Sequence, residues 1–418
     1  MREMKDSGVA WIGKIPHCWN TSKLKYLGQY INGYAFKPEE WGSKGVPIIR
    51  IQDLTGSNDN PNYFEGQIDK KYWVENGDIL ISWAATLDAF IWNKGNGWLN
   101  QHIFKAVPNR RIINYDFFFW MIKESMKNMN NDNKHGIFMQ HVTLSVFNNF
   151  TIPMPPLAEQ ERIAAFLDAE CAEIDAVLEK TRASIEEYRK LKQAVITQAV
   201  TKGIRGDRPM KDSGIEWIGD IPAEWDVVRI KNLFDYRNER NFKPLEEVNL
   251  ISLYTDKGVV QHCDLDETTG NKASNADGYK LVYENDIVVN IILCWMGAIG
   301  RSAYFGVTSP AYDVYSPKQK TNSKFYHYLF RTNGFSGDCY KVGRGIMAMR
   351  WRTYSDQFRA IKVVSPPQSE QEEIVEYLDE KCEGIDALIA KKQQYLTEIE
   401  NYKKSLIYEY VTGKKEVV

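Results

Sequence analysis

The sequence is dominated by an internal repeat. Residues 4–19 read MKDSGVAWIGKIPHCW, and residues 210–225 read MKDSGIEWIGDIPAEW. Later in each half, PPLAEQERIAAFLDAECAEID at 155–175 matches PPQSEQEEIVEYLDEKCEGID at 366–386. Because the blocks keep their order, the chain is a tandem duplication, and such a repeat restricts the fold to two similarly built halves.

Each half begins with a globular part of mixed α/β pattern. Residues 76–82, NGDILIS, correspond to residues 284–290, ENDIVVN. A helical spacing covers Tyr115–Met126, and its counterpart around Phe325–Phe330 is shorter. Short β-forming runs bounded by Gly, Asn, Asp and Pro predict strands at Val46–Ile51, Ile79–Trp83, Leu250–Tyr254 and Ile287–Leu293. Outside the repeated blocks the two parts differ, which suits two different binding surfaces and equally suits simple drift.

A helical heptad seam follows each Pro-Pro pair, with apolar side chains at steps of three and four residues. Ser369 with Glu372 predicts a capping box for the second helix, and Gly203 and Gly413 predict the helix ends. The first seam consists of Ile163, Leu167, Ile174, Leu178, Ile185, Tyr188 and Val195. The second seam consists of Ile374, Leu378, Ile385, Ile389, Leu396, Ile399 and Leu406.

Each helix is expected to run roughly 40 residues, or about 60 Å. Alone it would expose its apolar stripe, so it needs a partner, either within the chain or in another molecule. Equal lengths and matched seams favour pairing within the chain, and chain order favours an antiparallel pair with the globular parts at opposite ends. The sequence thus predicts an α+β protein in which two α/β-type domains are separated by a long antiparallel two-helix coiled coil, as a pseudo-two-fold internal repeat.

The expected segments are a first domain at 1–156, a first helix at 157–206, a second domain at 207–367 and a second helix at 368–418. The two domains are slightly basic, whereas residues 368–418 carry twelve acidic side chains against seven basic ones. Basic domains suit polyanion binding, although a difference of a few charges is weak support.

Sequence motifs for catalysis, metal binding and cofactor binding are missing. The six cysteines form no C-x-x-C pair, and the six histidines show no ligand spacing. There is no phosphate-binding loop, no G-x-G-x-x-G, no Asn-Pro-Pro-aromatic methyltransferase motif, no G-x-S-x-G and no nuclease-like acidic cluster. We therefore expect a non-catalytic chain with no cofactor or metal of its own. No apolar run is long enough to cross a membrane, and MREMKDSG is not a signal peptide, so we expect a cytoplasmic protein.

Several short motifs are spread over the chain, namely WIG-x-IP in each half, GYAFKPEEW with GVPIIRIQDL (33–54), NGDILIS, LNQHIF (99–104) and IPMPPLAEQERIAAFL (152–167). The second half repeats the opening and the PP-x-x-EQ element but lacks a clear GYAFK copy, and Arg240-Asn241-Phe242-Lys243 stands roughly there. Together these motifs resemble the specificity subunits of type I restriction–modification systems, over nearly the whole chain.

This resemblance implies a division of labour. Each globular part would be a target recognition domain that reads one half of a split, asymmetric sequence in double-stranded DNA. The two helices would set the spacer between the half-sites. Two modification subunits would bring S-adenosylmethionine to methylate adenine N6, and two restriction subunits would bring ATP- and Mg-dependent translocation and cleavage.

The DNA-contacting residues are predicted from side-chain chemistry, because base edges suit Arg, Lys, Asn and Gln while phosphates suit cations and hydroxyls. Residues 341–362 hold six Lys or Arg against one acid, Asp356, the densest basic stretch of the chain. In the first domain we predict Tyr34, Lys37, Gln52, Trp83, Thr86, Asn100, Gln101, Lys134, His135 and Gln140. In the second we predict Arg237, Arg240, Asn241, Lys243, Trp295, Lys341, Arg344, Arg350 and Arg352.

Two other classes of protein compete with this interpretation. A self-contained restriction endonuclease would need a catalytic cluster that the sequence lacks. A coiled-coil adaptor without a DNA role would need only the helices, and it differs from a specificity subunit in binding no DNA.

Overall fold

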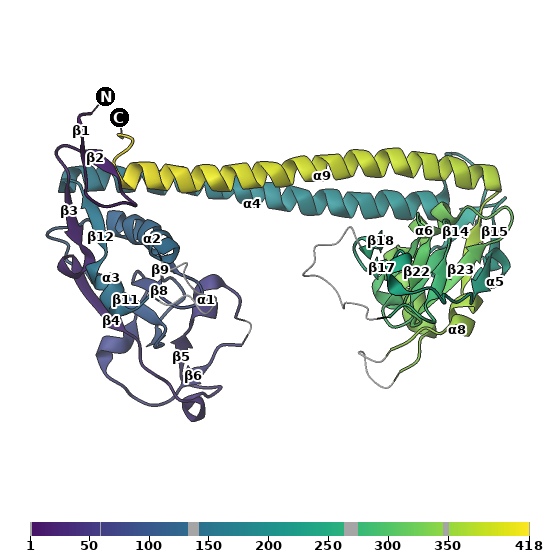
Figure 1. The fold of residues 1–418 in the computed structure, drawn as a ribbon, viewed down its shortest axis with the longest axis horizontal. Helices are drawn as coiled ribbons and strands as arrows, with labels where there is room; N and C mark the ends of the chain where they lie inside the picture. Colours follow the sequence, from purple (N-terminus) through teal and green to yellow (C-terminus); the bar gives the residue numbers. More distant parts are fainter. Residues whose placement is uncertain (1, 59, 133–141, 263–274, 346–350, 418) are drawn as a thin grey trace. The chain divides into compact units, whose positions relative to one another are not determined.

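The computed structural model describes residues 2–58, 60–132, 142–262, 275–345 and 351–417 (Figure 1). The chain forms two compact units, Met1–Arg182 with Gln394–Val418, and Ala183–Gln393. The first unit contains the first globular domain (residues 1–156), and the second contains the second globular domain (residues 207–367). Each unit also includes about half of each long helix, so the units cut across the four expected segments.

The first globular domain is built on two four-stranded sheets. The central sheet is antiparallel in the order β4-β11-β8-β9, and the other has the order β6-β5-β10-β7, with β10 parallel to β5. The central strands are β4 (Gly28–Asn32), β11 (Ile103–Pro108), β8 (Ile79–Ser82) and β9 (Asp88–Ile91). The others are β6 (Tyr63–Phe64), β5 (Val46–Ile49), β10 (Gly97–Leu99) and β7 (Trp73–Val74).

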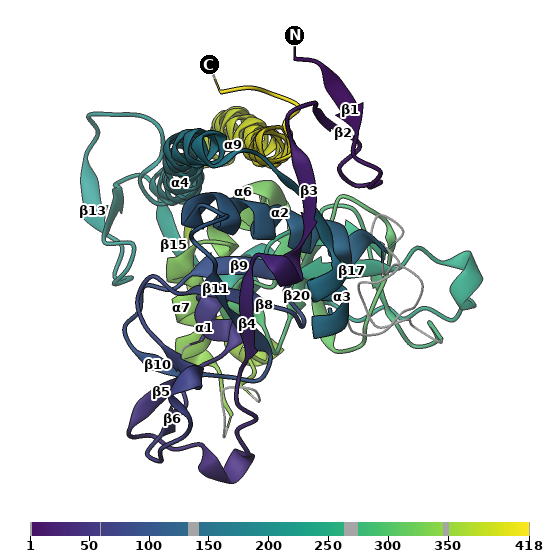
Figure 2. The same cartoon turned by 90° about the vertical axis from the view of Figure 1, so that its left-hand side faces the viewer.

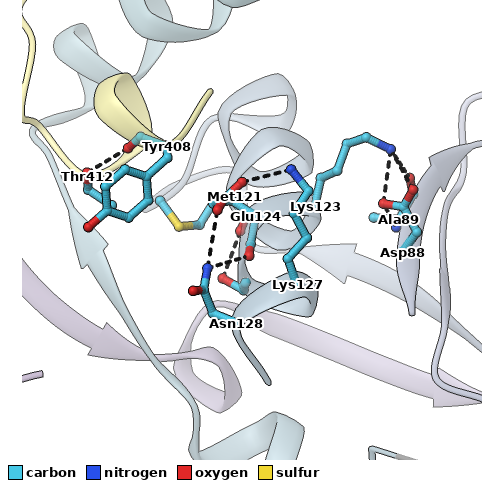
Figure 3. Close-up of polar contacts among 10 residues, drawn as sticks. Asp88, Ala89, Met121, Lys123, Glu124, Lys127, Asn128, Tyr408 and Thr412 are labelled. Carbon is cyan, nitrogen blue, oxygen red and sulfur yellow. Dashed lines mark hydrogen bonds and ion pairs between the residues drawn. The ribbon is translucent and has the colours of Figure 1, made fainter. Parts of the chain in front are cut away.

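Helix α2 (Tyr115–Asp132) packs against the central sheet of this domain. Its apolar side chains, including Phe117, Phe118 and Met121, are buried in the domain core. Figure 3 shows Lys123 of α2 reaching to β9, where its Nζ lies 2.9 Å from the Asp88 carboxylate. The shorter helices are α1 (Ile51–Thr55), α3 (Leu144–Asn149), η1 (Leu24–Tyr26), η2 (Pro38–Glu40) and η3 (Lys70–Tyr72).

The second globular domain repeats the central antiparallel sheet, in the order β16-β23-β20-β21. Its strands are β16 (Phe234–Arg237), β23 (Tyr312–Pro317), β20 (Ile287–Asn290) and β21 (Ile299–Arg301). Two-stranded sheets join β17 (Ile251–Tyr254) with β18 (Gly258–Gln261), and β19 (Lys280–Val282) with β22 (Gly306–Thr308). The helices are α5 (Ile230–Leu233), η4 (Leu245–Glu247), η6 (Cys294–Met296), α6 (Ser323–Phe330), α7 (Asn333–Val342) and α8 (Ser355–Ala360).

The predicted elements are confirmed in type, and their ends differ by a few residues. Helix α6 is shorter than α2, as the spacing indicated. Strand β5 ends at Ile49 rather than Ile51, because Arg50 caps helix α1 and its N–H donates to the Asp53 carboxylate at 2.7 Å. The predicted strand extended too far because the apolar pattern continues into α1, where Ile51 and Leu54 also pack on a core cluster.

Four short strands repeat with matching register at the edge of each domain. Hairpin β1-β2 pairs Met4 with Pro16, and hairpin β13-β14 pairs Met210 with Pro222. Strand β3 pairs with β12, and β15 pairs with β24. Strands β12 and β24 are the last strands before the two long helices. Their bounds are β1 (Met4–Asp6), β2 (Lys14–Pro16), β3 (Asn20–Lys23), β12 (Thr151–Met154), β13 (Met210–Asp212), β14 (Asp220–Pro222), β15 (Asp226–Arg229) and β24 (Lys362–Ser365).

The long helices α4 (Leu157–Lys202) and α9 (Gln368–Val411) lie side by side and antiparallel within each unit (Figures 1 and 2). In the first unit Asp175 and Lys403 form an ion pair at 2.6 Å. In the second, Lys192 pairs with Asp386 at 2.5 Å. The pairing is therefore within the chain, and the glycines predicted to end the helices, Gly203 and Gly413, have φ of +74° and +72°.

The side chains of the predicted seams are all buried or partly buried, as a paired helix requires. Polar residues interrupt the seams, and each has a partner. Lys192 and Lys403 reach aspartates of the opposite helix, the Thr181 hydroxyl donates to the Val177 carbonyl at 2.8 Å, and the Lys392 ammonium lies 5.7 Å from the centre of the Tyr188 ring.

A buried glutamate near the start of each long helix attaches the helix to its domain. Trp225 Nε1 donates to the Glu370 carboxylate at 2.8 Å, and Arg208 forms an ion pair with the same carboxylate at 2.6 Å. The first half repeats this arrangement with Trp19 donating to Glu159 at 2.9 Å and Arg2 pairing with Glu159. Both tryptophan side chains are fully buried, which explains why the tryptophan and the glutamate belong to the repeated blocks.

The glutamine that follows each glutamate bridges three segments. Gln160 Nε2 donates to the Pro155 carbonyl at 2.9 Å, and its Oε1 accepts from the Asn114 N–H at 2.8 Å. Gln371 makes the same two bonds, to Pro366 at 2.9 Å and from Asn322 at 2.8 Å. Because Asn114 and Asn322 cap α2 and α6, the glutamine links the long helix to the helix of the domain core.

The predicted capping box of the second helix is wrong. Helix α9 begins at Gln368, so Ser369 lies inside the first turn rather than before it. The Glu372 side chain instead accepts a hydrogen bond from the Gln368 amide at 3.0 Å. The Pro367 carbonyl, just before the helix, accepts from the N–H groups of Glu370 at 2.9 Å and Gln371 at 3.0 Å.

We predict that Glu370→Ala destabilises the second unit by about 3 kcal/mol, because it leaves the buried Trp225 N–H without its acceptor and removes the buried carboxylate that pairs with Arg208, which keeps only Glu224 as an ion-pair partner among the described residues. Urea unfolding followed by tryptophan fluorescence measures this. Glu376→Ala, an exposed residue of the same helix, is the control and should change the free energy of unfolding by less than about 0.5 kcal/mol. Equal effects of the two substitutions would contradict the role of Glu370.

Candidate nucleic-acid interface

Four of the predicted DNA-contacting residues in the first globular domain line one pocket of about 410 Å³, here called the amide pocket. Gln52 comes from helix α1, Thr86 from the β8–β9 turn, and Asn100 and Gln101 from the segment between β10 and β11. The other lining residues are Phe36, Trp41, Arg50, Ile51, Thr55, Ser57, Ala85 and His102. Three separate sequence motifs therefore contribute to a single surface.

Asn100 is held rigidly at this pocket. It forms a parallel bridge with Tyr34, and its N–H donates to the Ile49 carbonyl at 3.2 Å. Its Oδ1 accepts from the His102 N–H at 3.4 Å, and only 6% of the residue is exposed. The side-chain amide is thus fixed in position before any ligand arrives.

Helix α1 and the tryptophan before it form another side of the pocket. The Arg50 guanidinium lies 4.9 Å from the centre of the Trp41 ring, and Trp41 is 40% exposed. Gln52 follows in the first turn of α1 and is exposed. The sequence prediction missed Trp41, Arg50 and His102, although each lies inside a motif already identified, GYAFKPEEW, GVPIIRIQDL or LNQHIF.

The turn that carries Thr86 is fixed from both sides. Ala85 adopts φ of +59°, a left-handed conformation that is uncommon for a residue with a side chain. Asp88, two residues after Thr86, is bound by Lys123 of α2 at 2.9 Å (Figure 3). The helix therefore anchors the end of the turn, and the exposed Thr86 hydroxyl is presented at the pocket.

The remaining predicted residues of the first domain lie outside the pocket lining. Trp83 Nε1 donates to Asn32 Oδ1 at 3.2 Å. Tyr34 packs edge-on against Phe36, with ring centres 4.9 Å apart, and Lys37 is exposed at the start of η2. Lys134, His135 and Gln140 fall outside the residues that the structure describes.

In the second globular domain, backbone pairing brings two predicted arginines together. The Arg344 N–H donates to the Arg352 carbonyl at 2.9 Å, and the Arg352 N–H donates back at 3.0 Å. Both side chains are exposed, and no ion pair involves either of them among the described residues. This Arg344–Arg352 pair presents two cations next to each other, while Arg350 lies in the part of the chain that the structure leaves undescribed.

An aromatic stack lies next to the arginine pair. The Tyr340 ring stacks on the Trp351 ring with their centres 5.0 Å apart, and its centre lies 5.6 Å from that of the tilted Trp295 ring. Trp351 Nε1 donates to the Tyr340 carbonyl at 3.1 Å. Tyr340 is half exposed. Arginines beside exposed aromatic rings are a combination that suits nucleic acid, because phosphates attract the cations and bases pack on the rings.

Other predicted residues of the second domain are engaged within the protein. Arg237 pairs with the buried Asp286 at 2.9 Å, and burial raises the pKa of that carboxyl. The Arg240 guanidinium donates to the Gly278 carbonyl at 3.0 Å. Asn241 is buried, and its amide donates to the Lys243 carbonyl at 2.8 Å, which shapes the loop.

The loop that stands in place of GYAFK in the second domain presents a different surface. Phe242 is 83% exposed, whereas Phe36 of the first domain is 5% exposed. Lys243 is exposed beside Phe242, and Lys341 pairs with Glu216 at 3.0 Å on the surface. The two domains therefore share a scaffold and differ in the side chains that they present.

The sequence model described as "Type I restriction modification DNA specificity domain" matches residues 16–187 and 222–400. The chain belongs to this family. As a specificity protein it supplies recognition rather than catalysis. Among the described residues, no group of three His, Cys, Asp or Glu is placed to hold a metal ion, and none of the helices described is long and apolar enough to cross a membrane.

Curated relatives of this specificity protein carry the same description. The type I restriction enzyme EcoBI specificity subunit of Escherichia coli is 26% identical over 315 residues, which cover 72% of this chain and 65% of that protein. The MjaVIII specificity subunit of Methanocaldococcus jannaschii is 26% identical over 423 residues, covering 97% of this chain and 94% of that one.

Solved structures show that the fold is shared. A chain from the structure described as "complex assembly and conformational transition of the type I R-M system" superposes with a TM-score of 0.70 at 14% identity, covering 96% of this chain and 99% of that one. The HsdS subunit from Thermoanaerobacter tengcongensis gives 0.50 at 16% identity, covering 96% and 98%.

We predict that Gly343→Ala disrupts the aromatic stack. An added Cβ would lie 2.3 Å from Trp351 Nε1 and 3.2 Å from the Cys339 carbonyl, so the indole must move, at a cost of about 1–3 kcal/mol. Near-UV circular dichroism and urea unfolding measure the effect.

Gly337→Ala in helix α7 is the matched control. Its Cβ would meet nothing within 4 Å, and alanine favours a helix, so stability should rise by about 0.5–1 kcal/mol. If Gly343→Ala left both the spectrum and the stability unchanged, the close packing of Trp351 on this glycine would be wrong.

Proposed function

We propose that this chain is the DNA-recognition subunit of a type I restriction–modification complex, and that its two globular domains read the two halves of a bipartite, asymmetric target in double-stranded DNA. The observation that carries the proposal is the duplicated scaffold with two unlike polar surfaces. The amide pocket of the first domain is rich in amide groups, whereas the Arg344–Arg352 pair of the second is cationic.

Each of these surfaces suits a different part of recognition. Asn and Gln amides pair with adenine edges, and arginines pair with guanine edges or phosphates. Two different surfaces on one scaffold would make the two half-sites unlike, and the target asymmetric. The predicted residues that are engaged within the protein, such as Arg237 and Asn241, would then support the surface from behind rather than touch DNA.

Helices α4 and α9 would act as the spacer that separates the half-sites, and would offer a scaffold to the catalytic subunits. Two modification subunits would supply S-adenosylmethionine for adenine methylation. Two restriction subunits would supply ATP- and Mg-dependent translocation and cleavage. The complex would work in the cytoplasm, where the host DNA lies.

A coiled-coil adaptor without a DNA role is the second candidate, because paired long helices alone suit protein binding. A gel-shift experiment with and without the modification subunit separates the two. Sequence-dependent binding that strengthens with the partner supports recognition, whereas binding in neither case supports the adaptor.

We predict that Arg344→Ala and Arg352→Ala each weaken specific DNA binding, by about 1–3 kcal/mol if the lost contact is to a base edge. Fluorescence anisotropy with the target duplex measures this. Lys211→Ala, an exposed cation on strand β13 of the same unit, is the control for a general loss of charge. Unchanged affinity in both arginine variants would remove this pair from the interface.

We predict that one extra heptad in each helix lengthens the spacer and leaves both half-sites unchanged. The heptads are inserted after Glu187 in α4 and after Lys392 in α9, on the same side of the Tyr188–Lys392 contact. Seven residues add about 10 Å of helix, which corresponds to about three base pairs. Mapping of methylated motifs in a host that expresses the variant measures it, and altered half-sites with an unchanged gap would contradict the spacer role.

A further inference from the structure

The polar group that is held in place at the amide pocket, Asn100, is buried rather than carried at the tip of a protruding element. Only 6% of Asn100 is exposed, and the residue is anchored through its N–H and its Oδ1. Base edges in a stacked duplex lie inside the grooves, and proteins reach them with helices or strands that project outward. A recessed amide cannot enter a groove, so its ligand has to enter the pocket.

The pocket lining suits a flat, polar, aromatic ring. The Trp41 ring, backed by Arg50 at 4.9 Å, and the apolar side chains of Phe36 and Ile51 offer surfaces for packing. In the part of the chain that the structure describes, neither the Gln52 amide nor the Nδ2 group of Asn100 donates a hydrogen bond to another residue. A volume of about 410 Å³ lies in the range of pockets that hold a small ligand.

We propose that the amide pocket binds one unstacked nucleobase of the half-site read by the first globular domain. The amides of Asn100 and Gln52 hydrogen-bond to the polar edge of this base, and Trp41 packs against its face. The inference rests on the proposed DNA-recognition function and adds that one base leaves the duplex to be read. In the second domain Phe242 stands roughly where Phe36 stands in the first, and it is exposed where Phe36 is buried, so the two surfaces are built differently at this point.

An unstacked base has an energetic signature that groove contacts lack. Removing a base from the duplex costs free energy, and the cost is smaller when the base is already mispaired. A mismatch that keeps the bound base and changes only its partner therefore strengthens binding at that position. Where a base pair is read in a groove, a mismatch weakens binding instead.

The experiment uses the full chain in complex with its modification subunits, and a labelled duplex that carries the methylated motif of the host. Each base pair of the first half-site is mispaired in turn by changing one strand, and the dissociation constant is measured by anisotropy. We expect one position at which the mismatch tightens binding by about tenfold, which corresponds to about 1.4 kcal/mol. Asn100→Ala should abolish this gain.

Three comparisons make the result specific. Gln67→Ala, an exposed amide of the same domain outside the pocket, should keep the gain. Gln52→Ala should reduce it, and because Gln52 is exposed this variant tests the pocket even if Asn100→Ala fails to fold. A gain at the methylated adenine itself, caused by the modification subunit, should be the same in all these variants.

Two outcomes separate failure of this inference from failure of the proposed function. If every mismatch in the first half-site weakens binding, or if the gain survives both Asn100→Ala and Gln52→Ala, no base enters the pocket, while specific binding still supports recognition. If the complex binds no sequence in preference to another, the recognition function itself is wrong, and the pocket proposal falls with it.

Discussion

Attachment of each globular domain to its long helix depends on one carboxylate that is removed from water. Glu370 is fully buried, and such a charge is tolerated only because Arg208 and the Trp225 N–H both reach it. The indole N–H can donate in only one direction, and Arg208 reaches the carboxylate from another segment. The three groups therefore fix the orientation of the long helix against its domain as well as the contact between them. Glu159, Trp19 and Arg2 repeat the arrangement, so in each half the contact joins the two repeated blocks although they lie far apart in the sequence.

The other ends of the helices are attached by a second repeated contact. Lys202 Nζ donates to the Ile218 carbonyl at 2.8 Å, next to hairpin β13-β14, and Lys414 Nζ donates to the Ile12 carbonyl at 2.6 Å, next to hairpin β1-β2. Each domain therefore binds the beginning of one helix and the end of the other. The core of each unit continues from the sheet into both helices, as the buried Ile163 and Val411 of the first unit illustrate.

The sequence predicted the duplication, the helix pair and its seam, because these features depend on short-range periodicity and on repetition. It also indicated four of the twelve residues that line the amide pocket, because amide and hydroxyl side chains suit base edges and phosphates. It missed Trp41 and Arg50, because their stacking depends on how the loop after β4 folds back on α1. Likewise, nothing local distinguishes Arg237, which is paired with a buried aspartate, from the exposed Arg352. Whether an arginine is free to bind a ligand depends on whether the fold brings a buried acidic side chain from a distant part of the chain next to it, as it does for Arg237 and Asp286.

The central claim is that each globular domain reads its own half-site, independently of its place in the chain. The most direct measurement replaces Asp226–Ser365 by a second copy of Asn20–Met154, since both segments begin and end on the paired strands next to the helix junction. Methylated motifs are then mapped in a host that expresses this chain with its modification subunit. The account predicts a symmetric motif with two inverted copies of one original half-site. A motif that still contains the other half-site would contradict it, provided that the altered chain folds and supports methylation.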